Sequence, residues 1–251
     1  MPRFGSLLAT VVRGRYRACG GENVSIQRDL ESVEDRIRAA CMRSGRRRRE
    51  VRLVAVTKTV EAERINEAIR AGVRFIGENR VQEARDKFPL LIPVEGRHLI
   101  GQLQRNKAGK AVELFDLVES VDRISLAEAL SRRAAQLERE LPVLIEVNTS
   151  GEESKAGIAP GGAPELVEAA AALPNLSVRG LMTIGPLTQD QEKIRAAFRT
   201  LRELRDSLAQ KEIPGADLEH LSMGMSGDFE IGIEEGATIV RVGSAIFGRR
   251  A

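Results

Sequence analysis

Eight short apolar runs alternate with helix-like segments along most of the chain, and this alternation constrains the fold more than any other feature. Each run holds four to seven residues and is rich in Val, Ile and Leu, which is typical of strands buried on both faces. We therefore predict strands at residues 51–56, 73–76, 97–100, 117–120, 143–148, 177–183, 218–222 and 238–242.

Helical periodicity fills the segments between these runs. A helix is also predicted ahead of the first strand, at 25–42, because apolar residues there recur every three or four positions. Two helix starts carry capping signals: Ser125 with Glu128 has the pattern of a capping box, and Thr188 precedes a long periodic segment. The predicted helices between strands are 62–71, 81–87, 106–114, 125–140, 163–172, 189–210 and 229–235.

Strands that alternate with helices form parallel sheets, and eight of them close a (β/α)8 barrel of the TIM type. The competing architecture is a doubly wound open sheet, which would place a glycine-rich turn after the first strand; the sequence there, VTKTVEAE, contains no glycine. We predict one α/β domain at 25–251, a barrel with an extra N-terminal helix. Residues 1–24 are interpreted as a disordered leader, or as the product of a start codon placed too far upstream.

The composition is that of an ordinary soluble globular protein, with 42% hydrophobic residues, 30% charged residues and a net charge of +3. Two cysteines, Cys19 and Cys41, provide neither a metal-binding spacing nor a disulfide framework, so we expect a cytoplasmic location and no metal. No apolar stretch is long enough to span a membrane. The basic run at 46–49 could bind phosphate, but it is interpreted as a solvated loop after a helix end, where cations suit the helix dipole. It also lacks the interleaved aromatic residues of nucleic-acid binders.

Chemistry in such a barrel gathers at the carboxyl ends of the strands, where Lys58 follows the first strand. Burial lowers the pKa of an amine, and the run before Lys58 is apolar. A partly neutral amine adds to aldehydes, so Schiff-base formation is the functional interpretation; a surface lysine that extends into water is the alternative. The other candidates at strand ends are Asn79, Asn148, Met182, Ser222, Gly243 and Ser244.

Glycine-rich turns, SMGMSGD and VGSAIFG, lie at the ends of the last two strands. Their hydroxyl and backbone N–H groups suit an anion, and barrels of this type commonly hold phosphate in the loops after strands seven and eight. Glycines also mark ordinary turns, so each loop alone is weak evidence. Together with a lysine across the mouth, the two loops match a ligand with a phosphate and a carbonyl group, as in pyridoxal 5′-phosphate.

Five segments closely resemble the pyridoxal phosphate homeostasis proteins, a family with the fold of the N-terminal barrel of alanine racemase. They are VAVTK, GENRVQEA, HLIGQLQRNK, IEVNTSGEESKAGI and LSMGMSGDFEIGIEEGATIVRVGSAIFG, and the resemblance covers about 25–248. It implies pyridoxal 5′-phosphate held as a Schiff base on Lys58, with phosphate contacts from Ser222, Gly243 and Ser244. It also implies a non-catalytic protein that maintains the cofactor level and passes the cofactor to apo-enzymes.

The segment VRVGSAIFG also resembles the one with which alanine racemase brings an arginine to the pyridine nitrogen. This resemblance implies that Arg241 faces the ring nitrogen of the cofactor. A permanent cation there disfavours protonation of the nitrogen and makes the ring a poorer electron sink. The alternative is an arginine that pairs only with an acidic neighbour or with the phosphate.

Further candidates have two interpretations each. Asn79 has two compatible interpretations, a hydrogen bond to the cofactor and a cap for the next helix. Asn148 and Met182 end inward-facing strands and could line the ring, although methionine is more often core filler. Lys155 is interpreted as a surface lysine, with a second aldehyde-accepting amine as the alternative. His98 is interpreted as a packing or hydrogen-bonding residue rather than a catalytic base.

The rival function is a pyridoxal-phosphate-dependent amino-acid racemase of the alanine-racemase type. Racemisation with two bases needs a proton donor opposite the lysine, which in alanine racemase is a tyrosine from a second domain. The only tyrosine here is Tyr16, in the leader, and the chain ends at Ala251, just after the eighth strand. We therefore expect no catalytic residue and a monomeric protein.

Overall fold

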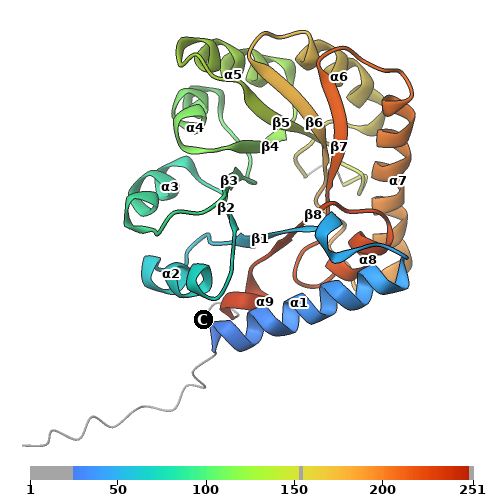
Figure 1. Ribbon diagram of the computed structural model, residues 1–251. Coiled ribbons are helices and arrows are strands. Elements are labelled where there is room, and N and C mark those ends of the chain that lie inside the picture. The colour runs from blue at the N-terminus through green and yellow to red at the C-terminus, as the bar shows by residue number, and fades with distance from the viewer. Residues whose placement is uncertain (1–24, 153–154, 249–251) are drawn as a thin grey trace, which may run out of the picture.

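The computed structural model describes residues 25–152 and 155–248, so the predicted leader at 1–24 lies outside the described residues. Within them, parallel strands follow one another in chain order and close into a barrel, in which β1 pairs with β8 (Figure 1). The predicted TIM-type barrel is confirmed, and the open sheet is wrong. The strands are β1 (Arg52–Val56), β2 (Phe75–Glu78), β3 (Gly96–Leu99), β4 (Leu117–Val121), β5 (Leu141–Glu146), β6 (Leu176–Met182), β7 (Ala216–Ser222) and β8 (Ile239–Val242).

Helices surround the barrel and cover the outer face of its sheet (Figure 1). Every helix predicted between strands is present, with ends shifted by a few residues, whereas the short α9 after β8 was not predicted. The α-helices are α1 (Ile26–Arg43), α2 (Ala62–Arg70), α3 (Val81–Lys87), α4 (Ala108–Leu114), α5 (Ile124–Gln136), α6 (Ala163–Ala171), α7 (Gln191–Ala209), α8 (Phe229–Glu234) and α9 (Ser244–Phe247). Short 3-10 turns are η1 (Arg48–Glu50), η2 (Phe88–Leu90), η3 (Arg105–Lys107) and η4 (Pro160–Gly162).

Two predicted capping signals are wrong. Helix α5 begins one residue before Ser125, after Arg123, and no side chain caps it. The cap of α7 is Asp190, whose carboxylate accepts two backbone N–H groups of the first turn. Thr188 instead accepts the N–H of Asp190 at 3.1 Å, so its hydroxyl orders the turn ahead of the helix.

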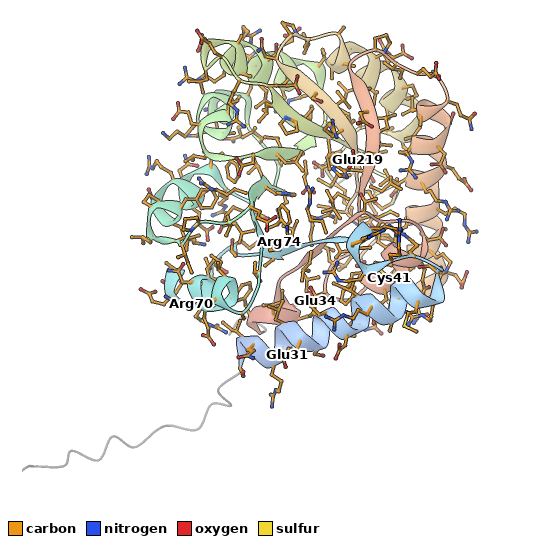
Figure 2. The ribbon with its side chains drawn as sticks, viewed as in Figure 1. Glu31, Glu34, Cys41, Arg70, Arg74 and Glu219 are labelled. Atoms are coloured by element: carbon orange, nitrogen blue, oxygen red, sulfur yellow. The ribbon has the colours of Figure 1, made fainter. Side chains whose placement is uncertain are left out.

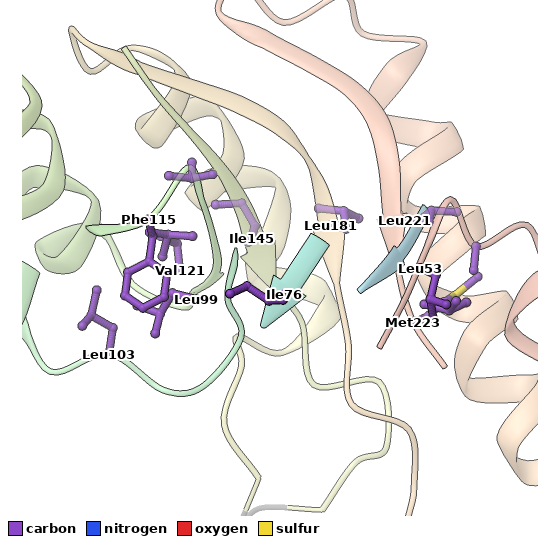
Figure 3. Close-up of a cluster of buried hydrophobic side chains, with 14 of the residues drawn as sticks. Leu53, Ile76, Leu99, Leu103, Phe115, Val121, Ile145, Leu181, Leu221 and Met223 are labelled. Atoms are coloured by element: carbon purple, nitrogen blue, oxygen red, sulfur yellow. The ribbon is translucent and has the colours of Figure 1, made fainter. Parts of the chain in front are cut away.

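Most of the apolar core lies between the sheet and the surrounding helices (Figure 3). Alternate strand residues such as Ile76, Ile145 and Leu181 fill this layer. A smaller cluster occupies the barrel interior and is formed by Val54, Leu117, Leu144, Met182 and Ile239, with Phe75 packed against it. Because both faces of the sheet are buried, the strands read as nearly continuous apolar runs.

Helix α1 packs along α8 and α9 (Figure 1). Its apolar stripe is buried there and includes Cys41 (Figure 2). Two ion pairs of 2.8 Å join α1 to α8, from Arg36 to Glu230 and from Arg43 to Glu234. Helices α8 and α9 are short, and the extra N-terminal helix α1 packs over them on that side of the barrel.

The basic run at 46–49 contributes to this attachment. Arg46 Nη1 donates hydrogen bonds to the carbonyl oxygens of Ile233 and Ala237, at 3.0 and 2.7 Å. Arg48 pairs with Glu34 of α1 at 2.7 Å. The run is therefore more than the solvated loop that we predict from sequence, because two of its cations hold α1 and the end of α8 in place.

Candidate functional site

A cavity of about 1030 Å³ opens at the carboxyl-terminal mouth of the barrel. The segments that follow β1, β7 and β8 line it. Four predicted site residues meet there: Lys58, Arg241, Gly243 and Ser244. The structure thus brings the lysine and the last glycine-rich turn to one space. The other lining residues are Val56, Thr59, Val60, Glu61, Arg64, Met225, Ser226, Gly227, Phe247 and Gly248.

The loop that carries Lys58 is held from behind by α3. Lys87 Nζ donates to the carbonyl oxygen of Thr57 at 2.8 Å, and Glu83 accepts the backbone N–H of Thr59. Thr59 has a φ of 60°, a left-handed conformation that costs a residue with a side chain about 1 kcal/mol or more. The contacts on both sides of Lys58 offset this strain and fix its backbone at the rim.

Glu78, at the end of β2, lies behind the same loop and is fully buried. Its Oε1 accepts hydrogen bonds from Lys87 Nζ at 2.8 Å and from Thr57 Oγ1 at 2.7 Å. Its Oε2 has no hydrogen-bond partner among the described residues. Burial raises the pKa of Glu78 despite the opposing effect of the Lys87 hydrogen bond. The Lys87 cation is thus the main compensation for a buried carboxyl group.

Ser226 joins the two glycine-rich turns. Its hydroxyl oxygen accepts the backbone N–H groups of Gly243 at 3.2 Å and Ala245 at 3.4 Å, so two donors point at one acceptor in the cavity. The turn itself depends on Gly224, which has a φ of 96°; a Cβ there would lie 2.7 Å from Phe229 Cα. Ser226 is absent from the predicted site residues, although the motif SMGMSGD contains it.

A charged layer lies above the apolar cluster in the barrel interior. Side chains two residues apart on a strand share a face. Glu119, Glu146 and Arg241 stand two positions after apolar interior residues of β4, β5 and β8, and therefore face the same interior closer to the mouth. Their exposures of 0%, 3% and 4% mean that their charges must be compensated inside the barrel.

Arg241 is held by a chain of hydrogen bonds. It donates through Nη1 to the hydroxyl of Ser222 and through Nη2 to the carbonyl oxygen of Thr183 at 2.7 Å. Ser222 donates in turn to Glu119, whose Oε2 lies 3.8 Å from Arg241 Nη1. The hydroxyl of Ser222, a predicted phosphate contact, is thus used inside the barrel by two charged partners.

The surroundings of Glu119 stabilise the ionised form of its carboxyl group. Burial alone would raise its pKa, but the hydrogen bond from His98 and the charge of Arg241 outweigh that effect and hold the pKa below its usual range. His98 Nδ1 lies 2.5 Å from Glu119 Oε1 and must donate, because an ionised carboxylate only accepts. His98 is therefore a hydrogen-bonding residue of the interior, as one of its two predicted structural roles requires.

Glu146 lacks such compensation. Its Oε2 has no hydrogen-bond partner within the described part of the chain. Burial, reinforced by the negative charge of Asp122, raises the pKa of Glu146 to about 7, although Arg241 acts in the opposite direction. Near neutral pH the interior therefore holds a carboxyl group that is partly protonated.

Besides Ser222, three predicted site residues do not line the cavity: Asn79, Asn148 and Met182. Asn79 lies before α3, but the cap position is Arg80, so the capping interpretation is wrong. Asn148 Nδ2 donates to the carbonyl oxygen of Glu152 at 2.8 Å and so shapes its own loop. Met182 is fully buried in the interior apolar cluster. Direct contact with a ligand stays a prediction for these three residues.

Lys155 ties two loops of the mouth together. Its Nζ donates to the carboxylate of Glu152 at 2.7 Å and to the carbonyl oxygen of Gly185, in the β6–α7 loop, at 3.0 Å. The expected solvated lysine is therefore also a structural contact.

Over residues 25–152 and 155–248, no helix is both long and apolar enough to cross a membrane. In the same ranges, no three side chains of His, Cys, Asp or Glu gather as metal ligands would.

Curated relatives match almost the full length of the chain. It is 47% identical over 222 residues to the pyridoxal phosphate homeostasis protein of Aquifex aeolicus, which covers 88% of this chain and 96% of that protein. It is 45% identical over 231 residues to the protein of the same name from Vibrio cholerae, covering 90% and 97% of the two chains. The family model described as alanine racemase, N-terminal domain, matches residues 29–251.

The chain also resembles solved structures. PipY of Synechococcus elongatus, solved with PLP bound, has a TM-score of 0.77 and 38% identity, and the match covers 89% of this chain and 100% of that chain. Alanine racemase of Clostridium difficile has a TM-score of 0.71 at 13% identity, over 90% of this chain and 57% of that chain, and so shares the fold. Fold and site define a barrel protein of the alanine racemase N-terminal class. Within this class, the chain belongs to the pyridoxal phosphate homeostasis protein family.

Proposed function

We propose that this chain binds pyridoxal 5′-phosphate through a Schiff base on Lys58 and acts as a carrier that maintains the cofactor level. One observation carries the proposal: Lys58 and the turns after β7 and β8 line a single cavity at the barrel mouth. A ligand with an aldehyde at one end and a phosphate at the other needs such an amine and such donors in one space. The names of the curated relatives and the PLP-bound structure of PipY support the same ligand.

The residues present fit the phosphate group. The N–H groups of Gly243 and Ala245 converge on the Ser226 hydroxyl, a position that an anionic oxygen can share or take. We assign the phosphate to this cradle, with Ser244 beside it in the cavity lining. Ser226 replaces Ser222 as the proposed hydroxyl contact, because the Ser222 hydroxyl is engaged by Arg241 and Glu119.

Arg241 is the proposed partner of the pyridine nitrogen. It lines the cavity while its side chain is only 3% exposed, so it meets a ligand from the barrel interior. The bound cofactor supplies an aldehyde for Lys58 and a ring whose electron-withdrawing strength depends on protonation of its nitrogen. A cation at that nitrogen disfavours its protonation and so weakens this strength.

Among the described residues that line the cavity, we find no second base of the kind that the racemase alternative needs. Besides Lys58, the ionisable side chains of the described lining are Glu61, Arg64 and Arg241. Glu61 follows Lys58 by three positions in the same loop, whereas a two-base reaction needs its second group on the opposite face of the substrate. We expect the loaded protein to exchange the α-proton of alanine in D₂O no faster than free cofactor does. Exchange at an enzymatic rate would favour the racemase.

Visible absorption tests the binding proposal. The purified protein, incubated with pyridoxal 5′-phosphate, is expected to gain a visible band that borohydride bleaches, and Lys58→Ala is expected to lose it. Lys155→Ala is the matched control, because Lys155 is the other lysine near the mouth that the sequence singles out, and it should keep the band. A band that survives in Lys58→Ala and disappears in Lys155→Ala would move the anchor to Lys155.

Transfer to an apo-enzyme tests the carrier role. Loaded protein is mixed with an apo-enzyme that uses pyridoxal phosphate, in the presence of a phosphatase that destroys free cofactor. We expect the apo-enzyme to regain activity under these conditions, and free cofactor at the same concentration to fail. Equal protection by both would contradict direct transfer. We further propose that the protein acts in the cytoplasm and is a monomer. Sedimentation at several protein concentrations would check the monomeric state.

A further inference from the structure

Arg241, Ser222 and Glu119 form a chain of hydrogen bonds, and close packing alone would not require these groups to be oriented as they are. Two nitrogen atoms of one guanidinium are directed to separate acceptors, Ser222 at the end of β7 and Thr183 directly after β6. The acceptor Ser222 is itself oriented, because its hydroxyl proton is committed to Glu119. A guanidinium with two fixed acceptors has little rotational freedom, so its remaining surface is presented to the cavity in one orientation.

Glu119 also changes the charge that a ligand meets. Its Oε2 lies 3.8 Å from Arg241 Nη1, and both side chains are nearly inaccessible to water. In such surroundings a nearby opposite charge offsets a large part of the potential of a cation. His98 holds Glu119 from the other side, so the carboxylate stays within reach of Arg241.

We propose that Glu119 and Ser222 are positioning residues for Arg241: they fix its guanidinium at the base of the cavity and offset part of its charge. The proposal rests on the proposed function, in which Arg241 faces the ring of the cofactor. Neither residue touches the ligand in this account; each acts through Arg241. Arg241 alone would give an uncompensated buried cation, whereas the chain gives one of fixed orientation and reduced strength.

Other charges face Arg241 and must be separated from the effect of Glu119. They come from β5, where Glu146 lies, and from the residue before α8, Asp228. Glu146 matters most, because its pKa of about 7 lies within the range of a titration. The pH titration of Glu119→Gln that is described next is therefore repeated in a Glu146→Gln background.

The test is a pH titration of the visible band of protein loaded with pyridoxal 5′-phosphate. In Glu119→Gln the shape of the side chain is kept and its negative charge is lost, so positive potential at the ligand rises. We expect the protonation midpoint of the bound chromophore to fall by about one pH unit, because a nearby positive charge favours the unprotonated form. Glu235→Gln is the matched control: Glu235 is buried and ion-paired with three arginines, outside the barrel interior.

A second variant keeps the proposal testable if Glu119→Gln does not fold. Ser222→Ala retains both charges but removes the hydroxyl between them, and we expect about fivefold weaker binding of pyridoxal 5′-phosphate. Ser131→Ala is its control, since it also removes a buried serine hydroxyl, whose 2.7 Å hydrogen bond to the carbonyl oxygen of Pro174 lies away from the cavity. Thermal unfolding of the apo-proteins checks that each of these variants folds, the Glu146→Gln background included.

The outcomes are distinct. An unchanged or raised midpoint in folded Glu119→Gln overturns the proposal for Glu119. A merely structural residue would lower thermal stability without moving the midpoint of the chromophore, which is the result that we expect for Glu235→Gln. Equal affinities of Ser222→Ala and Ser131→Ala overturn it for Ser222. A wild-type chain that gains no visible band overturns the proposed function itself, and the inference with it.

Discussion

The hydroxyl oxygen of Ser226, in the β7–α8 loop, lies 3.2 Å from the backbone nitrogen of Gly243, at the end of β8, and accepts its hydrogen bond. This contact joins the two turns to which we assign the phosphate. Backbone donors of Gly243 and Ala245 are already oriented toward one point, so little reordering is needed when an anion arrives.

Ser226→Ala should weaken binding of pyridoxal 5′-phosphate by about tenfold to about a hundredfold, because a hydrogen bond to a charged group contributes about 1.5–3 kcal/mol. Binding of pyridoxal, which has no phosphate, should be unaffected. Absorbance titrations with the two ligands measure both affinities. A loss of the same size for both ligands would mean that Ser226 does not act through the phosphate.

Gly224→Ala should destabilise the folded protein by about 1–3 kcal/mol, the usual cost of a left-handed residue with a side chain. Its φ is 96°, and the added Cβ would lie 2.7 Å from backbone atom Cα of Phe229. Gly227→Ala, in the same loop, is the control, since no atom lies within 4 Å of the Cβ position. Urea unfolding of both variants measures the difference, and equal stabilities would contradict the strained turn.

Lys87→Met should destabilise the protein by about 3 kcal/mol or more, because it leaves the buried carboxyl group of Glu78 without its cation. Glu78→Gln in the same chain should recover part of the loss. Lys110→Met removes an exposed pair with Glu113 and should cost well under about 1 kcal/mol. If urea unfolding gives Lys87→Met and Lys110→Met similar costs, the support that α3 gives to the Lys58 loop is weaker than we infer.

Glu146 should make stability depend on pH. Its folded-state pKa of about 7 lies above the ordinary value of 4.5, so the folded state holds its proton more tightly than the unfolded state. The resulting penalty is absent below the ordinary pKa, grows as the pH rises through this window, and reaches at most about 3 kcal/mol above the folded pKa.

Glu146→Gln removes this penalty. Urea unfolding from about pH 5 to about pH 8 should show the variant gaining stability over the wild type as the pH rises. Glu128→Gln, an exposed glutamate of α5, provides the control. A stability difference that is the same at all pH values would contradict the uncompensated burial of Glu146.

The barrel and half of the site are readable from the sequence because both depend on local pattern. The apolar run before Lys58 marks the end of β1, and the barrel rule places it at the same mouth as Gly243. The pairing of Ser222 with Glu119 could not be predicted, because these residues are 103 positions apart and meet only through the register of the closed barrel. The choice between Ser222 and Ser226 could not be made from pattern either. The predicted strand and β7 both end at Ser222, and only the three-dimensional structure shows that Arg241 and Glu119 engage the Ser222 hydroxyl.

Mass spectrometry of borohydride-reduced protein tests the central claim most directly. The protein is loaded with pyridoxal 5′-phosphate, reduced and digested, and the peptide that carries the phosphopyridoxyl mass is sequenced. The account predicts one dominant adduct, on Lys58. A dominant adduct on Lys155 or any other lysine, with Lys58 unmodified, would contradict it.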